Sequence, residues 1–255
     1  MTKTFLDPFI IFGLLIGISS IVVGNFVEGG TTAHLVQLAA ALIVFGGTFG
    51  AIVVSFPFLD LFIAVKGLKI AFSTNNQSVR LLIEKIINLL VIARKQGLMA
   101  LENEIPNISD DFLAKGVRMI VDGYDFEIIR NSLYREIRNY EETVKIASKV
   151  YTAAGGYAPT IGIIGAVLGL IYVLQNVTEP SKIGSGIATA FVATIYGVGS
   201  ANLIFIPIGN RIIQKAKDNI RIKLLILEGL NGIEKGVNPH ILRTVLESFS
   251  EGREL

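Results

Sequence analysis

Hydroxyl side chains lie inside two long uncharged stretches of this 255-residue sequence. Thr160 belongs to the stretch 150–178, and Thr194 and Tyr196 belong to the stretch 183–208. An ion that sheds water inside a membrane needs such oxygen atoms, because an unsatisfied polar group in hydrocarbon is costly. A threonine in a membrane helix often bonds a carbonyl of its own helix, so each hydroxyl also has a structural explanation. Several hydroxyls on adjacent helices indicate a hydrated path.

No ionisable side chain accompanies these hydroxyls. Asp, Glu, Lys, Arg and His are absent from both stretches. Moving a proton or Na⁺ through a membrane normally requires an ionisable group at depth. If the chain conducts ions, a partner must therefore bring the carboxylate, as in a two-component channel. The absence of cysteine excludes disulfides and cysteine-based metal sites. We expect no metal, no cofactor beyond the transported H⁺ or Na⁺, and no enzymatic activity.

Two further uncharged stretches, 8–27 and 35–59, open the chain. About 20 apolar residues are enough to cross the hydrocarbon core of a bilayer. The sequence therefore predicts four membrane helices in two hairpins. The composition agrees, because 51% of the residues are hydrophobic and only 17% are charged, and the mean hydropathy is +0.60. A soluble globular domain has about 25% charged residues.

Basic residues gather at one end of the predicted spans. They follow the second span, precede the third and follow the fourth, as Lys66, Lys69, Lys145, Lys149, Arg211, Lys215 and Lys217. Lys and Arg mark the cytoplasmic end of a span, so both termini are predicted in the cytoplasm. The predicted segments are a hairpin at 1–59, a cytoplasmic domain at 60–149, a pore-lining hairpin at 150–208 and a cytoplasmic tail at 209–255. Acids are interleaved with the bases, so nucleic-acid binding is not expected.

Helical periodicity runs through the segment 60–149, and no strand-like alternation appears anywhere, so the predicted fold is an all-α integral membrane protein. Apolar residues at helical spacing predict a helix over 78–92, which Gly97 interrupts or ends. Ser109, followed by two acids, is predicted to cap the next helix. From Asp125 a longer helix is predicted to run without interruption into the third span.

Small residues and prolines mark the last two spans. Gly162, Gly165 and Gly169 lie on the third span, where small residues four apart let helix backbones approach closely. Pro159 and Pro207 each remove a backbone hydrogen bond and bend a helix. The glycines are also compatible with ordinary packing and the prolines with tolerated kinks. The functional interpretation is a hinge or a packing notch beside a pore.

Three motifs in order carry a resemblance that covers nearly the whole chain. They are ARKQGLMALE at 93–102, APTIGIIGAVLGL at 158–170 and AFVATIYG at 190–197. Together they resemble the MotA/PomA family, the A subunit of the bacterial flagellar stator, which is related more distantly to TolQ and ExbB. Pro159 and Pro207 stand where this family has its two functional prolines.

The resemblance implies an assembly. Five copies of this chain, a homopentamer, would surround two MotB-type B subunits, each with an intramembrane aspartate and a peptidoglycan-binding domain. Ion flow across that aspartate would turn the ring of A subunits. The ring would then drive the rotor through the flagellar switch protein FliG. Such a stator lies in the lipid bilayer of the bacterial cytoplasmic (inner) membrane.

The resemblance also assigns residues. Arg94 and Glu102 match the rotor-facing charges, and their spacing of eight lets them share a face if the helix continues past Gly97. Thr194 matches the pore-lining threonine. Sodium-driven members tend to have threonine at the position of Ala166, so the alanine favours protons, although a hydroxyl elsewhere on the path could replace the missing one.

Other functions predict other sequences. A TolQ/ExbB-like energiser of outer-membrane processes would have three spans, so the extra N-terminal hairpin and the motif at 93–102 argue against it. A secondary transporter would show inverted repeats and broken helices around a midplane site, and the sequence shows neither. A purely structural scaffold leaves the intramembrane hydroxyls unexplained.

Overall fold

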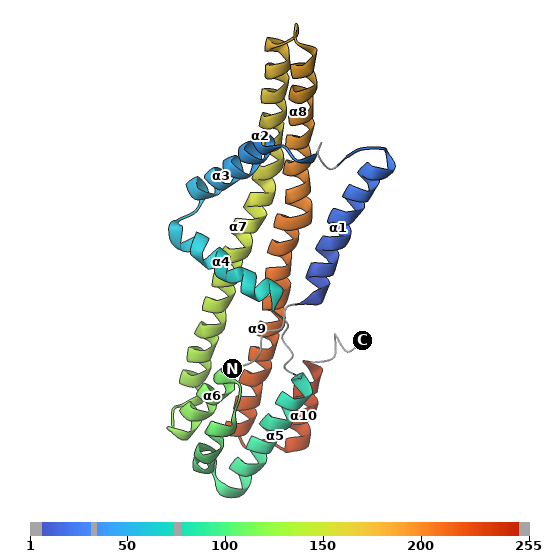
Figure 1. Cartoon of the computed structure of the whole chain (residues 1–255). Coiled ribbons are helices and arrows are strands. Elements are labelled where there is room, and N and C mark those ends of the chain that lie inside the picture. The colour runs from blue at the N-terminus through green and yellow to red at the C-terminus, as the bar shows by residue number, and fades with distance from the viewer. Residues whose placement is uncertain (1–6, 32–34, 74–77, 250–255) are drawn as a thin grey trace. The chain divides into compact units, whose positions relative to one another are not determined.

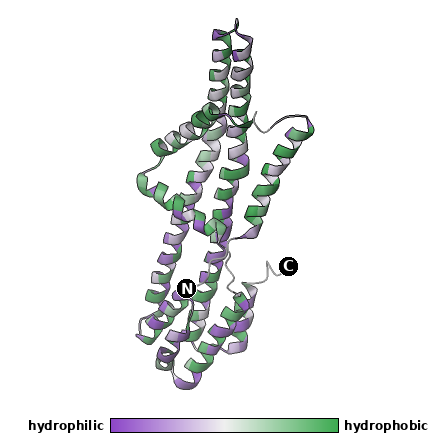
Figure 2. Cartoon of the chain, in the orientation of Figure 1, coloured by the Kyte–Doolittle hydropathy of each residue, from purple (hydrophilic) through white to green (hydrophobic). Residues whose placement is uncertain are grey.

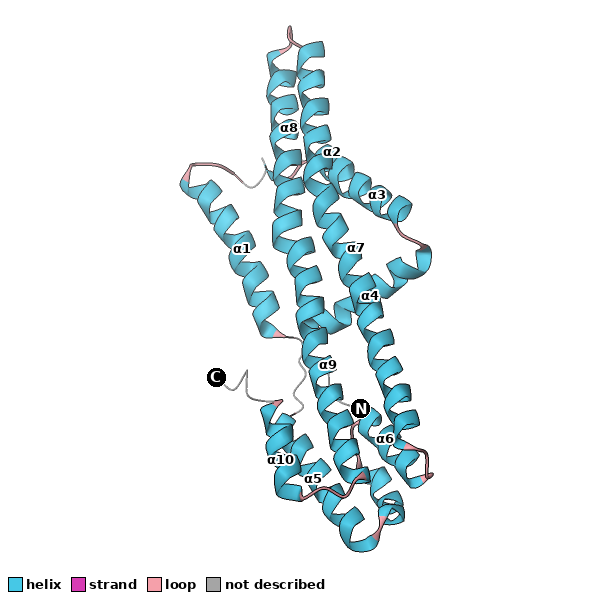
Figure 3. Cartoon of the chain, turned by 180° about the vertical axis from the view of Figure 1, so that it is seen from behind, coloured by secondary structure: helices cyan, strands magenta, loops and turns pink. Residues whose placement is uncertain are grey.

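The structure is a computed structural model that describes residues 7–31, 35–73 and 78–249. Every element within these residues is helical (Figures 1 and 3), which confirms the predicted all-α class. Contacts divide the chain into two compact units, Met1–Thr74 with Thr143–Lys215, and Asn75–Glu142 with Ala216–Leu255. We call them the membrane unit and the extramembrane unit, because the apolar parts of four helices long enough to cross a membrane belong to the first.

The first span is helix α1, Pro8–Val27, and it has the predicted bounds. Asp7 caps it, since its side chain accepts a hydrogen bond from the Phe9 amide. Pro8 suits the first turn, where its missing N–H would have had no partner in the helix. No residue of α1 is buried within the chain, as expected for an apolar helix with lipid on most sides.

The second span is interrupted and shorter than predicted. It consists of α2 (Leu38–Ala41), the π-helical segment η2 (Leu42–Gly46) and α3 (Gly47–Ser55). The predicted stretch to residue 59 was too long. Pro57 offers no N–H and disfavours helical geometry in the residue before it, and Phe56 is accordingly extended at φ −130° and ψ 139°.

Helix α4, Phe58–Phe72, follows this break and belongs to the membrane unit. Its residues from 60 onward fall in the segment 60–149 that the sequence predicts to be cytoplasmic. Gly67 lets α4 lie against α7 and α9. A Cβ atom at Gly67 would stand 2.8 Å from Ala147 Cβ and 3.3 Å from Ile212 Cδ1. Figure 2 shows that α4 is apolar over most of its length.

Two long helices carry the remaining spans. Helix α7, Phe126–Gln175, runs for 50 residues through Pro159, which confirms the predicted uninterrupted helix. After a short turn come α8 (Pro180–Ser200), the π-helical segment η4 (Ala201–Phe205) and α9 (Ile206–Glu234), which follow one another without a break. The α7 and α8 ribbons lie side by side (Figures 1 and 3). The N-terminal end of α1 lies near the start of α9, and the C-terminal end of α1 lies away from α8.

The extramembrane unit also contains four shorter elements. They are α5 (Val79–Gln96), the 3₁₀ helix η3 (Leu98–Asn107), α6 (Asp111–Val121) and α10 (Pro239–Ser248). Gly97 ends α5, because its φ of 88° requires glycine. The predicted cap of α6 was wrong by one residue, since Asp110 accepts the Leu113 amide at 2.8 Å. These helices enclose a core of leucine and isoleucine.

Candidate functional site

The α7–α8 contact is a backbone contact made possible by glycine. A Cβ atom at Gly197 of α8 would stand 2.5 Å from the carbonyl oxygen of Ala158. A Cβ atom at Gly162 of α7 would stand 2.9 Å from the carbonyl oxygen of Ala193. One at Gly169 would stand 2.8 Å from the Ala190 nitrogen. The neighbouring atoms belong to the backbone and cannot move aside as a flexible side chain could. These glycines therefore set the distance between the two helices.

The second span packs onto the same helix pair. A Cβ atom at Gly165 would stand 3.4 Å from Ile43 Cγ2 of η2 and 2.6 Å from Ala193 Cβ of α8. Ala166, the next residue, is half-buried. Gly47 of α3 meets Ile161 of α7, with 2.8 Å from its ideal Cβ position to Ile161 Cγ2. Small residues thus bring three spans together around α7.

The predicted ion-path threonines each donate to a carbonyl of their own helix. Thr160 Oγ1 donates to the Tyr157 carbonyl at 2.8 Å, and Thr194 Oγ1 donates to the Ala190 carbonyl at 3.3 Å. This is the structural arrangement that the sequence left open. A hydroxyl that donates in this way keeps its acceptor lone pairs, so both oxygens stay able to bind a cation or accept a proton.

Tyr196 joins the fourth span to the start of the second. Its hydroxyl donates to the Leu35 carbonyl at 2.6 Å and accepts from the Gln37 amide at 3.3 Å. The ring stacks on Phe45, with ring centroids 5.7 Å apart. The geometry gives Tyr196 a positioning role, since its hydroxyl already has two partners.

The two prolines lie in different surroundings. Pro159 is half-buried inside α7, close to the Gly155 carbonyl that its ring leaves without a helical partner. Pro207 is exposed in the second position of α9, two residues after the end of η4. π-helical segments occur often at functional sites, and this one gives the fourth span an irregular turn beside the proline.

Sequence reasoning missed Thr48 of α3. Its side chain is 2% exposed, and its hydroxyl is the one buried hydroxyl in the described residues that has no hydrogen-bond partner. In a regular helix it would bond the carbonyl four residues earlier, but that residue lies in η2. The available signal was a lone threonine in an otherwise apolar stretch next to two glycines.

A charged cluster at the end of the first span was also missed. Asp7 is 3% exposed. It accepts a hydrogen bond from Arg211 and pairs with Lys215 at 3.0 Å. Burial raises the pKa of the Asp7 carboxyl, but hydrogen bonds from Lys215 and Arg211 outweigh burial and hold the pKa below its ordinary value. The sequence feature that could have predicted this cluster is an acidic residue just before the first span together with basic residues just after the fourth.

The predicted rotor-facing charges are both exposed but do not share a helix. Arg94 lies in the last turn of α5, and its guanidinium donates to the Val237 carbonyl at 3.2 Å. Glu102 lies in η3, beyond the turn at Gly97. The condition for a common helical face is therefore not met, because Gly97 ends α5 and a 3₁₀ helix of different pitch follows.

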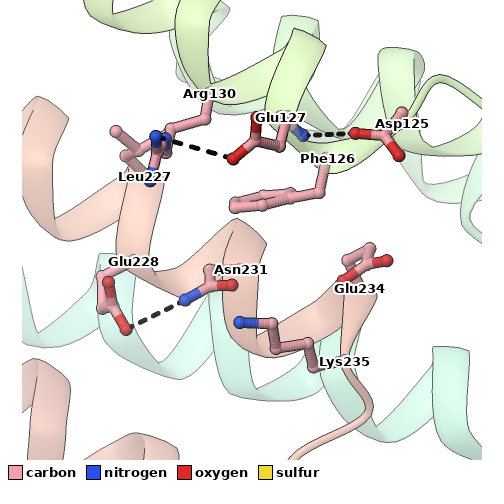
Figure 4. A pocket seen from close by; sticks show the side chains of 9 residues that line it. All are labelled: Asp125, Phe126, Glu127, Arg130, Leu227, Glu228, Asn231, Glu234 and Lys235. Atoms are coloured by element: carbon pink, nitrogen blue, oxygen red, sulfur yellow. Dashed lines mark hydrogen bonds and ion pairs between the residues drawn. The ribbon is translucent and has the colours of Figure 1, made fainter.

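A polar pocket of about 420 Å³ opens in the extramembrane unit between the start of α7 and the end of α9 (Figure 4). Glu127 pairs with Arg130 at 3.8 Å, and Asn231 donates to Glu228 at 3.3 Å. Lys235 lines the pocket and lies two residues before Val237, the partner of Arg94. No group of three or more His, Cys, Asp or Glu suited to a metal ion occurs in the part of the chain that the structure describes.

Known proteins share this architecture. Residues 104–223 match the MotA/TolQ/ExbB proton channel family. Motility protein A of Helicobacter pylori is 34% identical over 244 residues, which cover 96% of this chain and 95% of that protein. The solved structure of C. jejuni MotAB aligns over 98% of both chains with 32% identity and a TM-score of 0.92. The flagellar MotAB stator complex from Bacillus subtilis aligns over 94% of both chains with 30% identity and a TM-score of 0.87.

These similarities define a membrane-channel subunit and not an enzyme. The chain belongs to the MotA/TolQ/ExbB proton channel family. The relatives named here are motility proteins matched along almost their whole length, which confirms the predicted MotA/PomA resemblance and favours the flagellar role over a TolQ/ExbB-like one.

Proposed function

We propose that this chain is the A subunit of an ion-driven flagellar stator and works with a MotB-type, single-span B subunit in the bacterial inner membrane. The observation that carries the proposal is the match to MotAB structures over both the spans and the extramembrane unit. A TolQ/ExbB-like protein without the N-terminal hairpin would not align over nearly the whole chain.

The need for a partner follows from the chemistry of the spans. None of the four apolar stretches contains Asp, Glu, Lys, Arg or His. A protein that conducts protons or Na⁺ normally has such a residue at membrane depth. The B subunit would supply it as an intramembrane aspartate, and the α7–α8 pair would supply oxygen atoms beside it. Thr194 and Thr160 are the oxygen donors that we propose for this path, with Ala166 favouring protons over Na⁺.

Assembly and orientation are further parts of the proposal. Five copies would form the ring around two B subunits, with both termini and the extramembrane unit in the cytoplasm. The basic residues at one end of the spans support this orientation. Cysteines introduced at Thr31 and Ser181, both exposed, should react with a membrane-impermeant thiol reagent in intact cells. A cysteine at the exposed Ser109 should not react, and its labelling would contradict the orientation.

Force transfer is proposed at Arg94 and Glu102, with FliG as the partner. Both side chains are exposed, as a contact surface requires. Exposed ion pairs are typically worth under about 1 kcal/mol, so reversal of one charge should weaken motility mildly. Reversal of both should weaken it more, and an opposite reversal on FliG should restore part of the loss.

The decisive experiment measures ion flux in liposomes. We expect vesicles with this chain alone to hold an imposed proton or sodium gradient, and vesicles with this chain and its B subunit to dissipate it. Thr194→Val removes the oxygen and keeps the shape, so it should lower the flux, whereas Thr194→Ser should retain most of it. A clear conductance from this chain alone would contradict the two-component channel.

The threonine assignment has its own control. If Thr194→Val with the B subunit conducts normally at both low and high sodium, the Thr194 hydroxyl serves only its own helix. That result would remove Thr194 from the ion path and leave the role of the B subunit untouched.

A further inference from the structure

A groove runs between the first and fourth spans of the membrane unit. It holds about 280 Å³, and α1 lines one side with Phe9, Ile10, Gly13 and Leu14. Leu203 and Pro207 lie among the residues on the opposite side. The lining is apolar except for Asn202 and Arg211, and Phe9 remains 79% exposed within the chain. In a bilayer such a groove is filled by hydrocarbon, because water is excluded and an empty space forfeits contacts.

One end of this groove carries positive charge. Arg211 lines it, and Lys215 lies one helical turn further along α9. Both bond Asp7, so the three side chains together keep a net charge of one positive unit. Lys215 has three N–H donors, and Asp7 is its one ion-pair partner among the described residues.

Arg211 also has an unused donor. Its Nε atom is buried and has no hydrogen-bond partner within the described part of the chain, although 37% of the side chain is exposed. A buried N–H that lacks an acceptor costs free energy. The exposed part of the side chain is a guanidinium with further N–H donors, and an anion that reached it from the open side of the groove would accept from them.

We propose that this groove binds an anionic glycerophospholipid, with one acyl chain between α1 and η4 and its phosphate at Arg211 and Lys215. Basic pockets between membrane helices are a known way to hold acidic headgroups. The apolar groove and the cationic end are continuous, as a lipid requires. A net positive end also discriminates, because a zwitterionic headgroup brings a positive charge close to it.

The exposure of α1 on all its sides supports the binding of a lipid in this groove. No residue of α1 is buried, and Gly13 has no atom within 4 Å of its ideal Cβ position, so the space beside it is open. One turn further on, the ideal Cβ position of Gly17 lies 3.1 Å from Leu203 Cδ2, so the two helices are in contact there. A chain of methylene groups beside Gly13 would complete the contact between α1 and the fourth span.

The test is lipid binding by native mass spectrometry of the protein purified with its B subunit. The probes are phosphatidylglycerol and phosphatidylcholine with identical acyl chains. We expect about tenfold tighter binding of phosphatidylglycerol, which corresponds to about 1.4 kcal/mol. Both lipids carry a phosphate, but only phosphatidylcholine brings a quaternary ammonium close to the positive end of the groove. Arg211→Gln should remove the preference between the two headgroups, and Lys217→Gln, two residues past Lys215 and exposed, should retain it.

A second pair of variants distinguishes the loss of the groove from a general loss of structure. Gly13→Leu fills the groove and leaves Asp7 alone, so both lipids should lose affinity. Gly24→Leu is its matched control, because Gly24 also has no atom within 4 Å and does not line the groove. Equal losses in both variants, or no headgroup preference in the unaltered protein, would overturn the proposal. A change in subunit number with Gly13→Leu and unchanged lipid binding would assign the groove to a second copy of the chain, which also overturns it.

Discussion

The membrane unit and the extramembrane unit are both all-helical, but their interiors are built from different residues. Among the large side chains of the described residues that are less than 2% exposed, all but Ile212 belong to the extramembrane unit. In the membrane unit the buried apolar residues are mainly alanine, such as Ala154, Ala158, Ala190 and Ala193. Glycine allows the backbones of α7 and α8 to approach closely there, as at Gly162, Gly169 and Gly197.

The surroundings explain this difference. In water, burying a large aliphatic side chain is strongly favourable, so the extramembrane unit gathers leucine and isoleucine. In lipid, burial gains little, because the acyl chains are as apolar as leucine, and helices associate through close backbone packing. The membrane unit therefore depends on shape and the extramembrane unit on buried area. The first two predictions below break these two dependences, and the third tests a surface charge that belongs to neither.

The largest effect should come from a cavity in the extramembrane core. Leu230 is fully buried, and its side chain fills the space that a Cβ atom at Gly116 would occupy. Leu230→Ala should destabilise this unit by about 2–5 kcal/mol, measured as the free energy of opening from amide exchange in α6. Leu81→Ala is the control, since Leu81 is 70% exposed and should change stability by less than about 0.5 kcal/mol. Equal effects of the two variants would contradict the comparison.

The next effect should come from added volume in the membrane unit. Gly197→Leu places atoms where the Ala158 backbone already lies, so α7 and α8 must separate at a cost of about 1–3 kcal/mol. We expect a lower melting temperature in detergent and loss of ion flux with the B subunit. Gly199→Leu, two residues away with no atom within 4 Å, should leave both unchanged. A stable, conducting Gly197→Leu protein would mean that backbone proximity does not hold this pair.

The smallest effect should come from a charge on the surface of the extramembrane unit. Glu136 bonds Lys115 at 2.8 Å and Lys223 at 3.0 Å. Partial burial raises the pKa of Glu136, but the two lysines outweigh burial and hold it below its ordinary value. The stabilisation is therefore present above the unfolded pKa and is lost as the pH falls through the lowered folded pKa.

The variant Glu136→Gln tests this pH dependence. At neutral pH it should destabilise the unit by under about 1 kcal/mol, because the pair is partly exposed. Below a pH of about 4, where the free carboxyl is protonated, the difference from the unaltered protein should shrink toward zero. A difference that is constant across this range would show that Glu136 acts through packing and not through charge.

The fold could be predicted from the sequence where it follows from local patterns of residues. The bounds of α1 and the unbroken course of α7 followed from uncharged runs and helical periodicity, which are local properties. The end of the second span at Ser55 and the end of α5 at Gly97 depended on single residues, Pro57 and Gly97. Their signals were visible, but the sequence left open whether each residue ends its helix.

The site was predictable only in part. Thr194, Thr160 and the glycines of the third span could be named as candidates from the sequence, because polar and small residues stand out in an apolar run. The partners of Tyr196 and Asp7 come from residues more than 150 positions away, and no periodicity reports such pairs. The two π-helical segments were also missed, since their sequences resemble ordinary helix.

The most direct test of the account is the rotation speed of tethered cells that lack their own stators and express this chain with its B subunit. We predict that rotation returns only when both chains are present. The double reversal Arg94→Glu with Glu102→Arg should abolish most rotation while the pair still conducts ions in liposomes. No rotation with the unaltered pair, or full rotation with the double reversal, would contradict the division between an ion-conducting membrane unit and a rotor-contacting extramembrane unit.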